Sequence, residues 1–345
     1  MGEHPGTRTA GASVIGLDIG GANLKAAHSD NLAIVQPFPL WKQPEALAGA
    51  IKNLVEQLPP ANLVAATMTG ELCDCFSSKE EGVRHILVAL RTALPNQSLF
   101  VWRNDACLRP FETVVDDLLP SAAANWLALA CFAGWLAPQG PALLIDMGST
   151  TTDIIPLLDG KPCPEGRTDL ERLRSNELVY LGASRTPLCA LLGPPYAAEW
   201  FATTRDVYLL LGMRDENPED KESADARPAT REAAHGRVAR MLCADAKDLP
   251  STVTREIAML ADRALRERVC AALEKVRERL PGPPQCLIIS GSGEFLIEQL
   301  VAEVFRPLPR VESFRERFGS KLSTCACAFA LAMLTQEYRA DERPH

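Results

Sequence analysis

Two segments of the chain share one local pattern, in which a strand-forming run meets an aspartate, a glycine turn and a second strand-forming run. The segments are 16–25, with the sequence GLDIGGANLK, and 144–153, with the sequence LIDMGSTTTD. A tight turn that contains glycine offers backbone N–H groups to a phosphate without obstruction by Cβ atoms, and an aspartate at its edge can hold a magnesium ion. Two such turns that face each other would bind a polyphosphate from both sides.

The residues of these two turns are candidates for binding phosphate and a metal ion. The predicted phosphate ligands are Gly20, Gly21, Asn23, Lys25, Gly148, Ser149, Thr150 and Thr151. Asp18 and Asp153 are predicted to be catalytic and to hold Mg2+ through water, while Asp146 is a third metal-side carboxylate that anchors the second turn. Lys25 lies two residues after Asn23, so a regular strand places both on one face; this spacing fits a phosphate contact and a surface position equally.

The order of the expected elements also repeats along the chain. Strands are expected at 13–18, 22–28, 32–37, 62–68 and 98–103, with helices at 44–58 and 79–93. A buried helix within 122–141 follows, and strands at 142–146 and 151–157 restart the pattern before a strand at 285–290. Between them, helices are expected at 170–174, 186–192, 198–211, 231–246 and 251–279. The restart indicates two related lobes, with a helical insertion in the second.

Composition limits the kinds of partner that the chain would bind. Its 345 residues, 47% hydrophobic and 23% charged, are typical of a soluble globular protein of about two domains. A net charge of −8 argues against a nucleic-acid or anionic-membrane surface, and the longest apolar run is too short to span a bilayer. Eleven cysteines scattered through apolar stretches are typical of the reducing cytoplasm. We therefore expect small-molecule partners, no nucleic acid and no membrane.

The segment 214–228 has a different composition from the rest of the chain. It contains six acidic residues, three basic residues and two prolines, with almost nothing apolar. Such a composition cannot bury enough apolar surface to form a core. We expect a mobile, solvated connector rather than an ordered lid over a substrate.

A third glycine turn, Gly291-Ser292-Gly293, follows the last expected strand and precedes a helix at 294–304. The amino terminus of a helix attracts anions, so this turn is a candidate site for a substrate or nucleotide. In this order, the three glycine turns resemble the motifs of the actin-like ATPase superfamily. Five segments narrow the resemblance to the hydantoinase A/oxoprolinase-related branch: 69–72, 125–126, 146–153, 185–187 and 206–208.

The resemblance implies an α/β fold of two ribonuclease-H-like lobes around a cleft, with helical insertions in the second lobe. Residues 1–12 would be a disordered tail, 13–121 the first lobe, 122–141 a connector helix, and 142–319 the second lobe with its insertion at about 168–280. A final helix at 320–337 would pack back on the first lobe. In this family the turn at 291–293 looks like the adenosine motif.

Within this branch, the chain is most similar to proteins linked to tetrahydromethanopterin-dependent one-carbon metabolism. Members of that group in methanogens make a methanofuran precursor, by joining an aminomethylfuran-methyl diphosphate to the phenol of glutamyl-tyramine with loss of diphosphate. The resemblance therefore implies a transferase with a phosphorylated substrate and a phenolic acceptor. Mg2+ would assist, and ATP is not required by this interpretation.

The acceptor side of such a reaction needs a base, because a phenol loses its proton as the ether forms. Glu71 and Asp105 follow expected strand ends, where ligands collect in open α/β sheets, so both are candidates for the base or for substrate positioning; each fits a helix cap as well. Arg185 is a candidate for binding a substrate carboxylate or phosphate, although an ion pair between the lobes fits its position equally.

Two other classes of function remain open at this point. The chain could use ATP, as a small-molecule kinase or as an amidohydrolase of the hydantoinase kind, and the turn at 291–293 favours this alternative. It could also be a nucleotide-dependent assembly protein, although the sequence has no heptad repeat. A homo-oligomer is compatible with any of these functions.

Overall fold

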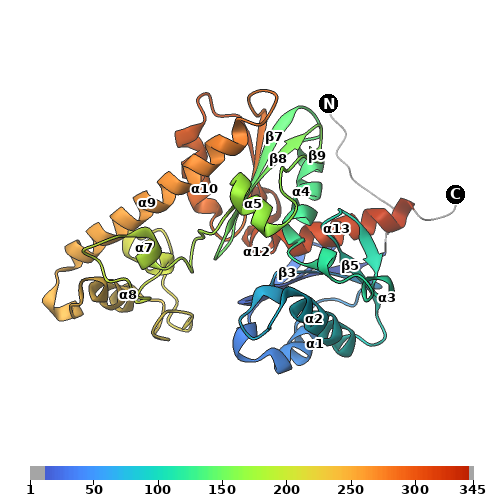
Figure 1. Cartoon of the computed structure of the whole chain (residues 1–345), viewed down its shortest axis with the longest axis horizontal. Helices are drawn as coiled ribbons and strands as arrows, with labels where there is room; N and C mark the ends of the chain where they lie inside the picture. Colours follow the sequence, from blue (N-terminus) through green and yellow to red (C-terminus); the bar gives the residue numbers. More distant parts are fainter. Residues whose placement is uncertain (1–11, 342–345) are drawn as a thin grey trace.

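The computed structural model describes residues 12–341, and the side chains of 12–338. The tail expected at 1–12 therefore lies outside the described residues, except for its last position. The chain folds into two α/β lobes, each built on a six-stranded sheet, as the sequence predicts (Figure 1).

The sheet of the first lobe has the order β3-β2-β1-β4-β5-β6. Its strands are β1 (Val14–Ile19), β2 (Asn23–His28), β3 (Leu32–Pro37), β4 (Leu63–Met68), β5 (Ser98–Trp102) and β6 (Leu108–Pro110). The helices α1 (Leu47–Glu56) and α2 (Lys79–Ala93) pack together on one side of this sheet, and a short helix, α3 (Phe111–Val114), follows β6. The apolar faces of α1 and α2 bury leucine, isoleucine and valine side chains against β1 and β4, which forms the core of the lobe.

The sheet of the second lobe repeats the arrangement around its first strand. Its strands are β7 (Pro141–Met147), β8 (Thr152–Leu158), β9 (Lys161–Pro162), β10 (Leu178–Val179), β11 (Cys286–Ser290) and β12 (Arg310–Ser313), in the order β10-β8-β7-β11-β12 with β9 also paired to β8. In the first lobe, β1 pairs antiparallel with β2 and parallel with β4. In the second, β7 pairs antiparallel with β8 and parallel with β11. The strands β1, β2 and β4 therefore correspond to β7, β8 and β11, with the same relative directions in the two sheets.

Two apolar helices lie between the lobes. They are α4 (Asn125–Leu136) and α13 (Ala326–Asp341), and one apolar cluster joins them to both sheets. The chain approaches so closely here that a Cβ on Gly16 of β1 would lie 2.0 Å from the backbone oxygen of Ala328. This contact holds the carboxyl-terminal helix against the strand that leads into the first glycine turn.

The single final helix expected at 320–337 is wrong in one detail, because the chain forms two helices there. They are α12 (Ser320–Thr324) and α13, separated at Cys325. The backbone N–H of Gly291 donates to both the carbonyl oxygen and the hydroxyl of Ser323, at 3.2 and 3.0 Å. That carbonyl accepts a bond from the second lobe, and the helix is interrupted there.

The helical insertion forms an arm that projects from the second lobe (Figure 1). The helices of this lobe are α5 (Asp169–Ser175), α6 (Leu188–Leu191), α7 (Thr204–Leu211), α8 (Arg231–Ala239), α9 (Ser251–Arg277), α10 (Glu294–Val304) and α11 (Phe314–Phe318). Three of them are shorter than expected at 186–192, 198–211 and 231–246. For α7 the reason is local: Thr203 and Asp206 form a capping box that starts the helix at Thr204.

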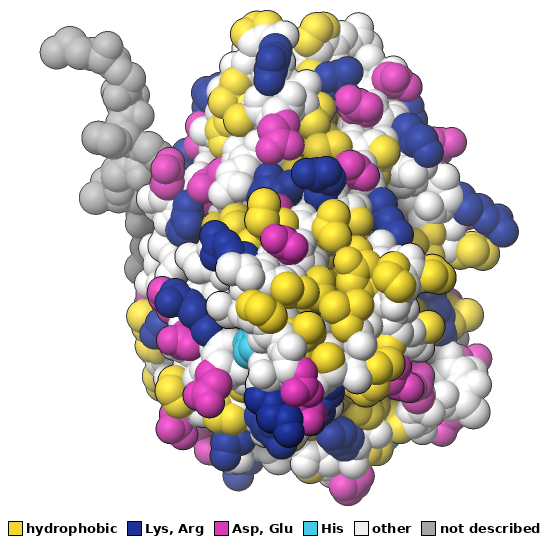
Figure 2. Space-filling view, turned by 90° about the vertical axis from the view of Figure 1, so that its left-hand side faces the viewer, with side chains coloured by type: hydrophobic (Ala, Val, Ile, Leu, Met, Phe, Trp, Pro, Cys, Tyr) yellow, Lys and Arg dark blue, Asp and Glu magenta, His cyan; other side chains and the backbone are white. Residues whose placement is uncertain are grey.

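The surface of the arm carries both hydrophobic and charged side chains. Figure 2 looks onto the side of the molecule from which the arm projects, and hydrophobic side chains gather near the middle of this view. Trp200 is 53% exposed and Met259 is also exposed. None of the helices within residues 12–341 is both long and apolar enough to cross a bilayer.

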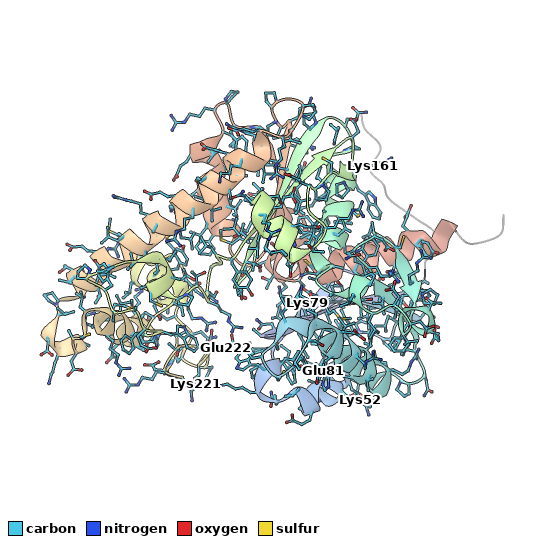
Figure 3. All side chains as sticks on the ribbon, viewed as in Figure 1. Lys52, Lys79, Glu81, Lys161, Lys221 and Glu222 are labelled. Atoms are coloured by element: carbon cyan, nitrogen blue, oxygen red, sulfur yellow. The ribbon has the colours of Figure 1, made fainter. Side chains whose placement is uncertain are left out.

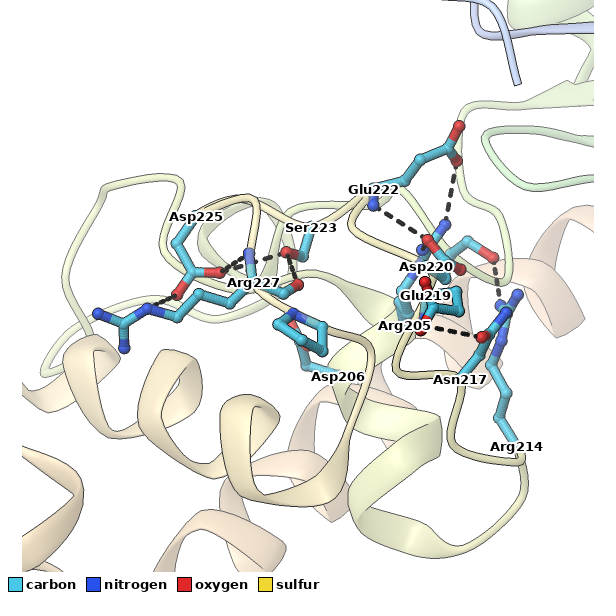
Figure 4. A network of polar contacts seen from close by, with 12 residues as sticks. Arg205, Asp206, Arg214, Asn217, Glu219, Asp220, Glu222, Ser223, Asp225 and Arg227 are labelled. Atoms are coloured by element: carbon cyan, nitrogen blue, oxygen red, sulfur yellow. Dashed lines mark hydrogen bonds and ion pairs between the residues drawn. The ribbon is translucent and has the colours of Figure 1, made fainter.

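The acidic segment 214–228 is bound to the arm, which corrects the expectation of a free connector (Figure 4). Arg205 donates to Asp220 at 2.5 Å and to Glu222 at 3.3 Å. Arg237 is fully buried and donates to Asp225 at 3.1 Å. Arginines from α7 and α8 therefore neutralise this segment and hold it in place, and composition alone does not reveal them. Lys221 and Glu222 lie on the side of the arm that faces the first lobe (Figure 3).

Candidate functional site

A cleft between the two lobes contains both glycine turns. Every predicted phosphate-binding residue lines it, as do the three predicted metal-side carboxylates and the predicted substrate residue Arg185. The structure thus brings together residues that are more than 120 positions apart in the sequence. Its floor is formed by the ends of β1, β2, β7 and β8.

The two glycine turns have the same backbone hydrogen bond. Gly20 N–H donates to the carbonyl oxygen of Asn23 at 3.1 Å, and Gly148 N–H donates to that of Thr151 at 2.8 Å. The strand registers also correspond: Asp18 is paired with Lys25 across β1 and β2, and Asp146 with Asp153 across β7 and β8. The lobes therefore present the same scaffold with different side chains at one of the two paired positions.

In the first lobe, Asp18 and Lys25 are paired across β1 and β2, and both line the cleft. Burial raises the pKa of Asp18 above its usual value, more than the attraction of Lys25 lowers it. Burial would lower the pKa of Lys25, but the carboxylates of Asp18 and Asp146 raise it above its usual value. Lys25 therefore carries its charge inside the cleft, and of the two positions that its spacing allowed, the structure selects the one beside the phosphate loops.

In the second lobe, the two facing carboxylates depend on groups from elsewhere in the chain. Burial, together with the neighbouring carboxylate of Asp153, raises the pKa of Asp146 to about 6. Asp146 accepts a hydrogen bond from Ser290 at 2.6 Å. Asp153 accepts one from Arg172, a fully buried residue of α5 whose guanidinium lies 4.0 Å from the ring centre of Trp126. Asp153 is therefore part of a buried ion pair, which the sequence does not indicate.

Each glycine turn accepts a backbone hydrogen bond from a segment later in the chain. Leu40 N–H donates to the carbonyl oxygen of Gly21 at 2.9 Å, which fixes the neighbouring Trp41 next to the first turn. Arg185 N–H donates to the carbonyl oxygen of Ser149 at 2.8 Å, which fixes Arg185 next to the second. The guanidinium of Arg185 lies 5.0 Å from the ring centre of Trp41, so the two segments meet across the cleft.

Glu71 does not line the cleft, although its neighbours Leu72 and Cys73 do. Its carboxylate is buried, and neither oxygen has a hydrogen-bond partner among the described residues. Burial, together with the negative charge of the cleft residue Asp169, raises the pKa of Glu71 to about 7. Its position thus does not support direct contact with a substrate, whereas its pKa would suit proton transfer near neutral pH.

Asp105 lies away from the cleft. It is in the turn that joins β5 to β6, where its carboxylate accepts from Cys107 N–H at 3.1 Å and lies 3.5 Å from Arg103. The strand-end argument fails here because β6 turns back antiparallel to β5 and carries the chain away from the cleft. The structure therefore gives Asp105 a role in this turn.

The glycine turn at 291–293 is also absent from the cleft lining. Gly291 has φ +95°, and a Cβ there would lie 2.3 Å from the carbonyl oxygen of Met147. Gly293 N–H donates to the same oxygen at 2.8 Å. These glycines are needed for close packing of β11 and α10 against β7, and Gly291, Ser292 and Gly293 are not among the residues that line the cleft.

Several residues that line the cleft are not among the candidate site residues assigned from the sequence. They are Trp41, Thr69, Cys73, Asn125, Asp169, Arg172, Tyr180 and Cys327. Only Asp169 and Arg172 carry a local signal, because Thr168 and Glu171 form a capping box that starts their helix. That signal predicts a helix, but it does not predict which face of the helix meets the cleft.

The cleft carboxylates do not form a ready-made metal cluster. Among the described side chains, no group of three or more histidine, cysteine, aspartate or glutamate residues is arranged to hold a metal ion. Asp18 does keep one buried carboxylate oxygen, Oδ1, without a hydrogen-bond partner within the described part of the chain. A buried oxygen of this kind is a suitable ligand for a hard cation such as Mg2+.

Comparison with known proteins places the chain in a family. Residues 62–338 match the hydantoinase/oxoprolinase family. A protein of Methanocaldococcus jannaschii, named (4-{4-[2-(γ-L-glutamylamino)ethyl]phenoxymethyl}furan-2-yl)methanamine synthase, is 31% identical over 335 residues, which cover 94% of this chain and 98% of that protein. A protein of Methanococcus vannielii with the same name is 32% identical over 201 residues, covering 56% of this chain and 89% of that protein. The chain belongs to the hydantoinase/oxoprolinase family and is an enzyme, which confirms the resemblance.

Solved structures show the same fold at low sequence identity. A nucleotide-free acetone carboxylase overlaps with a TM-score of 0.52 at 10% identity, covering 93% of this chain and 70% of that chain. Component A of the (R)-2-hydroxyglutaryl-CoA dehydratase of Acidaminococcus fermentans gives 0.46 at 12% identity, covering 95% and 99%. The first likeness supports the two-lobed fold alone, and the second is too low to carry an argument.

Proposed function

We propose that this chain is a transferase of methanofuran biosynthesis, which joins an aminomethylfuran-methyl diphosphate to the phenol of glutamyl-tyramine or a tyrosine analogue. The observation that carries the proposal is the match along nearly the whole chain to a synthase whose product contains a phenoxymethylfuran group. That group is an ether between a phenol oxygen and a furan methylene carbon. Such an ether forms when the phenol attacks a methylene that bears a leaving group.

The chemistry suits a cleft with two phosphate loops. The phenol oxygen forms a bond to the methylene carbon and loses its proton, while the bond from that carbon to the diphosphate oxygen breaks. Diphosphate departs with the electron pair of that bond. Preorganised cations and hydrogen-bond donors lower the barrier by stabilising the charge that develops on the leaving group. Lys25 and residues 149–151, which carry hydroxyl groups, line the cleft, and this supports the proposal that they do so.

Magnesium fits the same place. The unpartnered Oδ1 of Asp18 and the carboxylate of Asp146 are the groups that would hold it, since Asp153 is already paired with Arg172. Mg2+ usually binds proteins through one or two carboxylates together with substrate phosphates and water. When bound, it would neutralise charge on the diphosphate.

Two parallel reactions test the proposal. The protein would receive Mg2+ with either ATP or the furan-methyl diphosphate together with glutamyl-tyramine, and diphosphate, phosphate, ADP and ether would be measured. We expect diphosphate and ether in equal amounts from the second mixture. Asp18→Asn should lose turnover while staying folded. The exposed control Asp116→Asn should stay folded and keep its turnover. ADP or phosphate release that depends on an alcohol or amide, without ether, would contradict the proposal.

An ATP-dependent kinase or amidohydrolase has less support. The sequence feature that favours this alternative is the glycine turn at 291–293, whose residues pack against β7 and do not line the cleft. The ATP arm of the experiment above tests it directly.

A further inference from the structure

The mouth of the cleft contains an aromatic side chain with a fixed backbone. Trp41 lies in a short 3-10 helix, Leu40–Lys42, whose first residue is fully buried. Leu40 packs so closely that a Cβ on Gly70 would lie 2.7 Å from it, and its N–H is bonded to Gly21. The Trp41 ring itself is 36% exposed and lines the cleft. A flat apolar surface is therefore held rigidly beside the first phosphate loop.

A cation without a carboxylate partner lies next to this ring. No aspartate or glutamate within the described part of the chain forms an ion pair with Arg185, in contrast to Arg172, which is paired with Asp153. The contact that positions the Arg185 guanidinium is the Trp41 ring, 5.0 Å from its central carbon. A planar guanidinium binds a carboxylate through two parallel hydrogen bonds. Arg185 is thus available to an anionic group of a ligand that stacks on Trp41.

These two side chains belong to opposite lobes, and each is attached to its own phosphate loop. Leu40, next to Trp41, is bonded to the first loop, and Arg185 is bonded to the second. A group bound between them would lie at the mouth of the cleft, with the phosphate loops directly behind it. Tyr180, which is 62% exposed and also lines the cleft, adds a second aromatic side chain to this opening.

Charge decides which ring of the proposed reaction fits this position. The furan donor carries an aminomethyl group, which is a cation near neutral pH and would be repelled by Arg185. The γ-linked glutamyl group of the phenolic acceptor carries an ammonium group as well, but it also offers a carboxylate, with which Arg185 can pair. The donor also already has its diphosphate group to place on the loops.

We propose that Trp41 and Arg185 form the acceptor subsite, in which the phenol ring stacks on Trp41 and the glutamyl carboxylate pairs with Arg185. This inference rests on the proposed function and adds to it a specificity-determining residue, Trp41, that belongs to neither phosphate loop. Arg185 exchanges its contact with the ring of Trp41 for the carboxylate of the acceptor. The acceptor is then recognised through its own aromatic ring and its own carboxylate together.

Steady-state kinetics with Trp41→Ala, Trp41→Phe and Arg185→Gln test the subsite. Trp41→Ala should raise the KM for glutamyl-tyramine about tenfold and leave the KM for the diphosphate donor within about twofold. Trp41→Phe keeps a ring and should restore most of the affinity. Arg185→Gln should raise the KM for glutamyl-tyramine but not the KM for tyramine, because tyramine lacks the carboxylate. Matched controls are Trp200→Ala, an exposed tryptophan of the arm, and Arg317→Gln, an arginine 5.6 Å from the ring of Phe318.

An equal change in both KM values, or no change in the acceptor KM of Trp41→Ala, would overturn the subsite while leaving the proposed function intact. If the wild-type protein makes no ether, a binding measurement tests the acceptor subsite separately from the proposed function. Glutamyl-tyramine alone should quench tryptophan fluorescence in the wild type and in Trp200→Ala, and not in Trp41→Phe. Quenching in the absence of ether formation would contradict the function and keep the subsite. Quenching that persists in Trp41→Phe, or none in the wild type, would overturn the subsite.

Discussion

The two phosphate loops have the same backbone and different charges. At the position where the first loop has Lys25 opposite Asp18, the second has Asp153 opposite Asp146. The first loop thus contains its own cation, while the second takes Arg172 from α5, at the start of the helical insertion. The two loops therefore differ in what their charges do in the structure: the first loop presents a positive charge to the cleft, and the second is held in shape by a buried ion pair.

The largest expected effect comes from removing the cation of the first loop. In Lys25→Met, the charge that faces the leaving diphosphate is lost, while the side chain keeps a similar length. We expect kcat/KM for the diphosphate donor to fall by about 10²- to 10³-fold, comparable to the loss of one preorganised donor in other enzymes. Steady-state kinetics would measure this, with the exposed Lys52→Met as the control. A change below about threefold would contradict the role given to Lys25.

The comparison predicts a stability difference between the two loops. Asp153→Asn leaves the buried Arg172 with only its longer ion pair to Asp169, at 3.5 Å, and breaking a buried ion pair costs roughly 3 to 5 kcal/mol. Asp18→Asn should change the free energy of unfolding by less than about 1 kcal/mol, because burial of Asp18 and its attraction to Lys25 act in opposite directions. Urea unfolding of both variants tests this. Equal losses would show that the loops do not differ in this way.

The glutamates after the equivalent strands β4 and β11 extend the comparison. Glu294 accepts from Ser313, Ser323 and the N–H of Arg315, whereas Glu71 has no partner among the described residues. The pKa of Glu71 is about 7 in the folded chain against about 4.5 when exposed, so the folded state binds more protons between these values. The free energy of unfolding should therefore fall as pH rises from about 5 to 8.

Glu71→Gln removes that titration, so its stability should depend less on pH, by up to about 3 kcal/mol over this range. Unfolding curves at pH 5 and pH 8 measure the difference, with the exposed Glu45→Gln as the control. Parallel pH profiles for Glu71→Gln and the wild type would argue against the raised pKa.

The smallest expected effect separates the glycines of the two turns. A Cβ on Gly20 would lie 2.9 Å from the carbonyl oxygen of Asn23, whereas the contact for Gly148 is an ordinary 3.6 Å to Thr151. Gly20→Ala should destabilise the fold by about 1 to 3 kcal/mol, and Gly148→Ala by about 0.5 kcal/mol or less. Thermal unfolding of both variants would show this order, and the reverse order would contradict it.

The sequence predicts those parts of the site that are contiguous in the chain. Each phosphate loop lies within ten consecutive residues, so its aspartates, glycines and hydroxyl groups can be assigned from local pattern alone. The repeated order of strands predicts the two lobes for the same reason. Arg172 reaches the cleft from α5, where it binds Asp153. Trp41 reaches the cleft because the N–H of its neighbour Leu40 donates to Gly21. No local sequence pattern carries that information.

The wrong expectations also have a physical cause. Strand-end reasoning placed Asp105 at the cleft, but it assumes that the chain continues away from the sheet edge, whereas a hairpin returns it. The glycine turn at 291–293 has the expected position after β11, but the approach of Met147 already explains its glycines. The composition of 214–228 suggested a mobile segment. It does not reveal the arginines that bind this segment, because they lie outside it, on α7 and α8.

The most direct test of the account follows the oxygen atom between carbon and phosphorus in the donor. The furan-methyl diphosphate would be prepared with ¹⁸O at that bridge and incubated with glutamyl-tyramine and Mg2+. If the paired loops hold a departing diphosphate, the carbon–oxygen bond breaks, and mass spectrometry will find the ¹⁸O in diphosphate and none in the ether. Label retained in a furan-methyl alcohol, with unlabelled phosphate or diphosphate, would show cleavage at phosphorus and contradict the account.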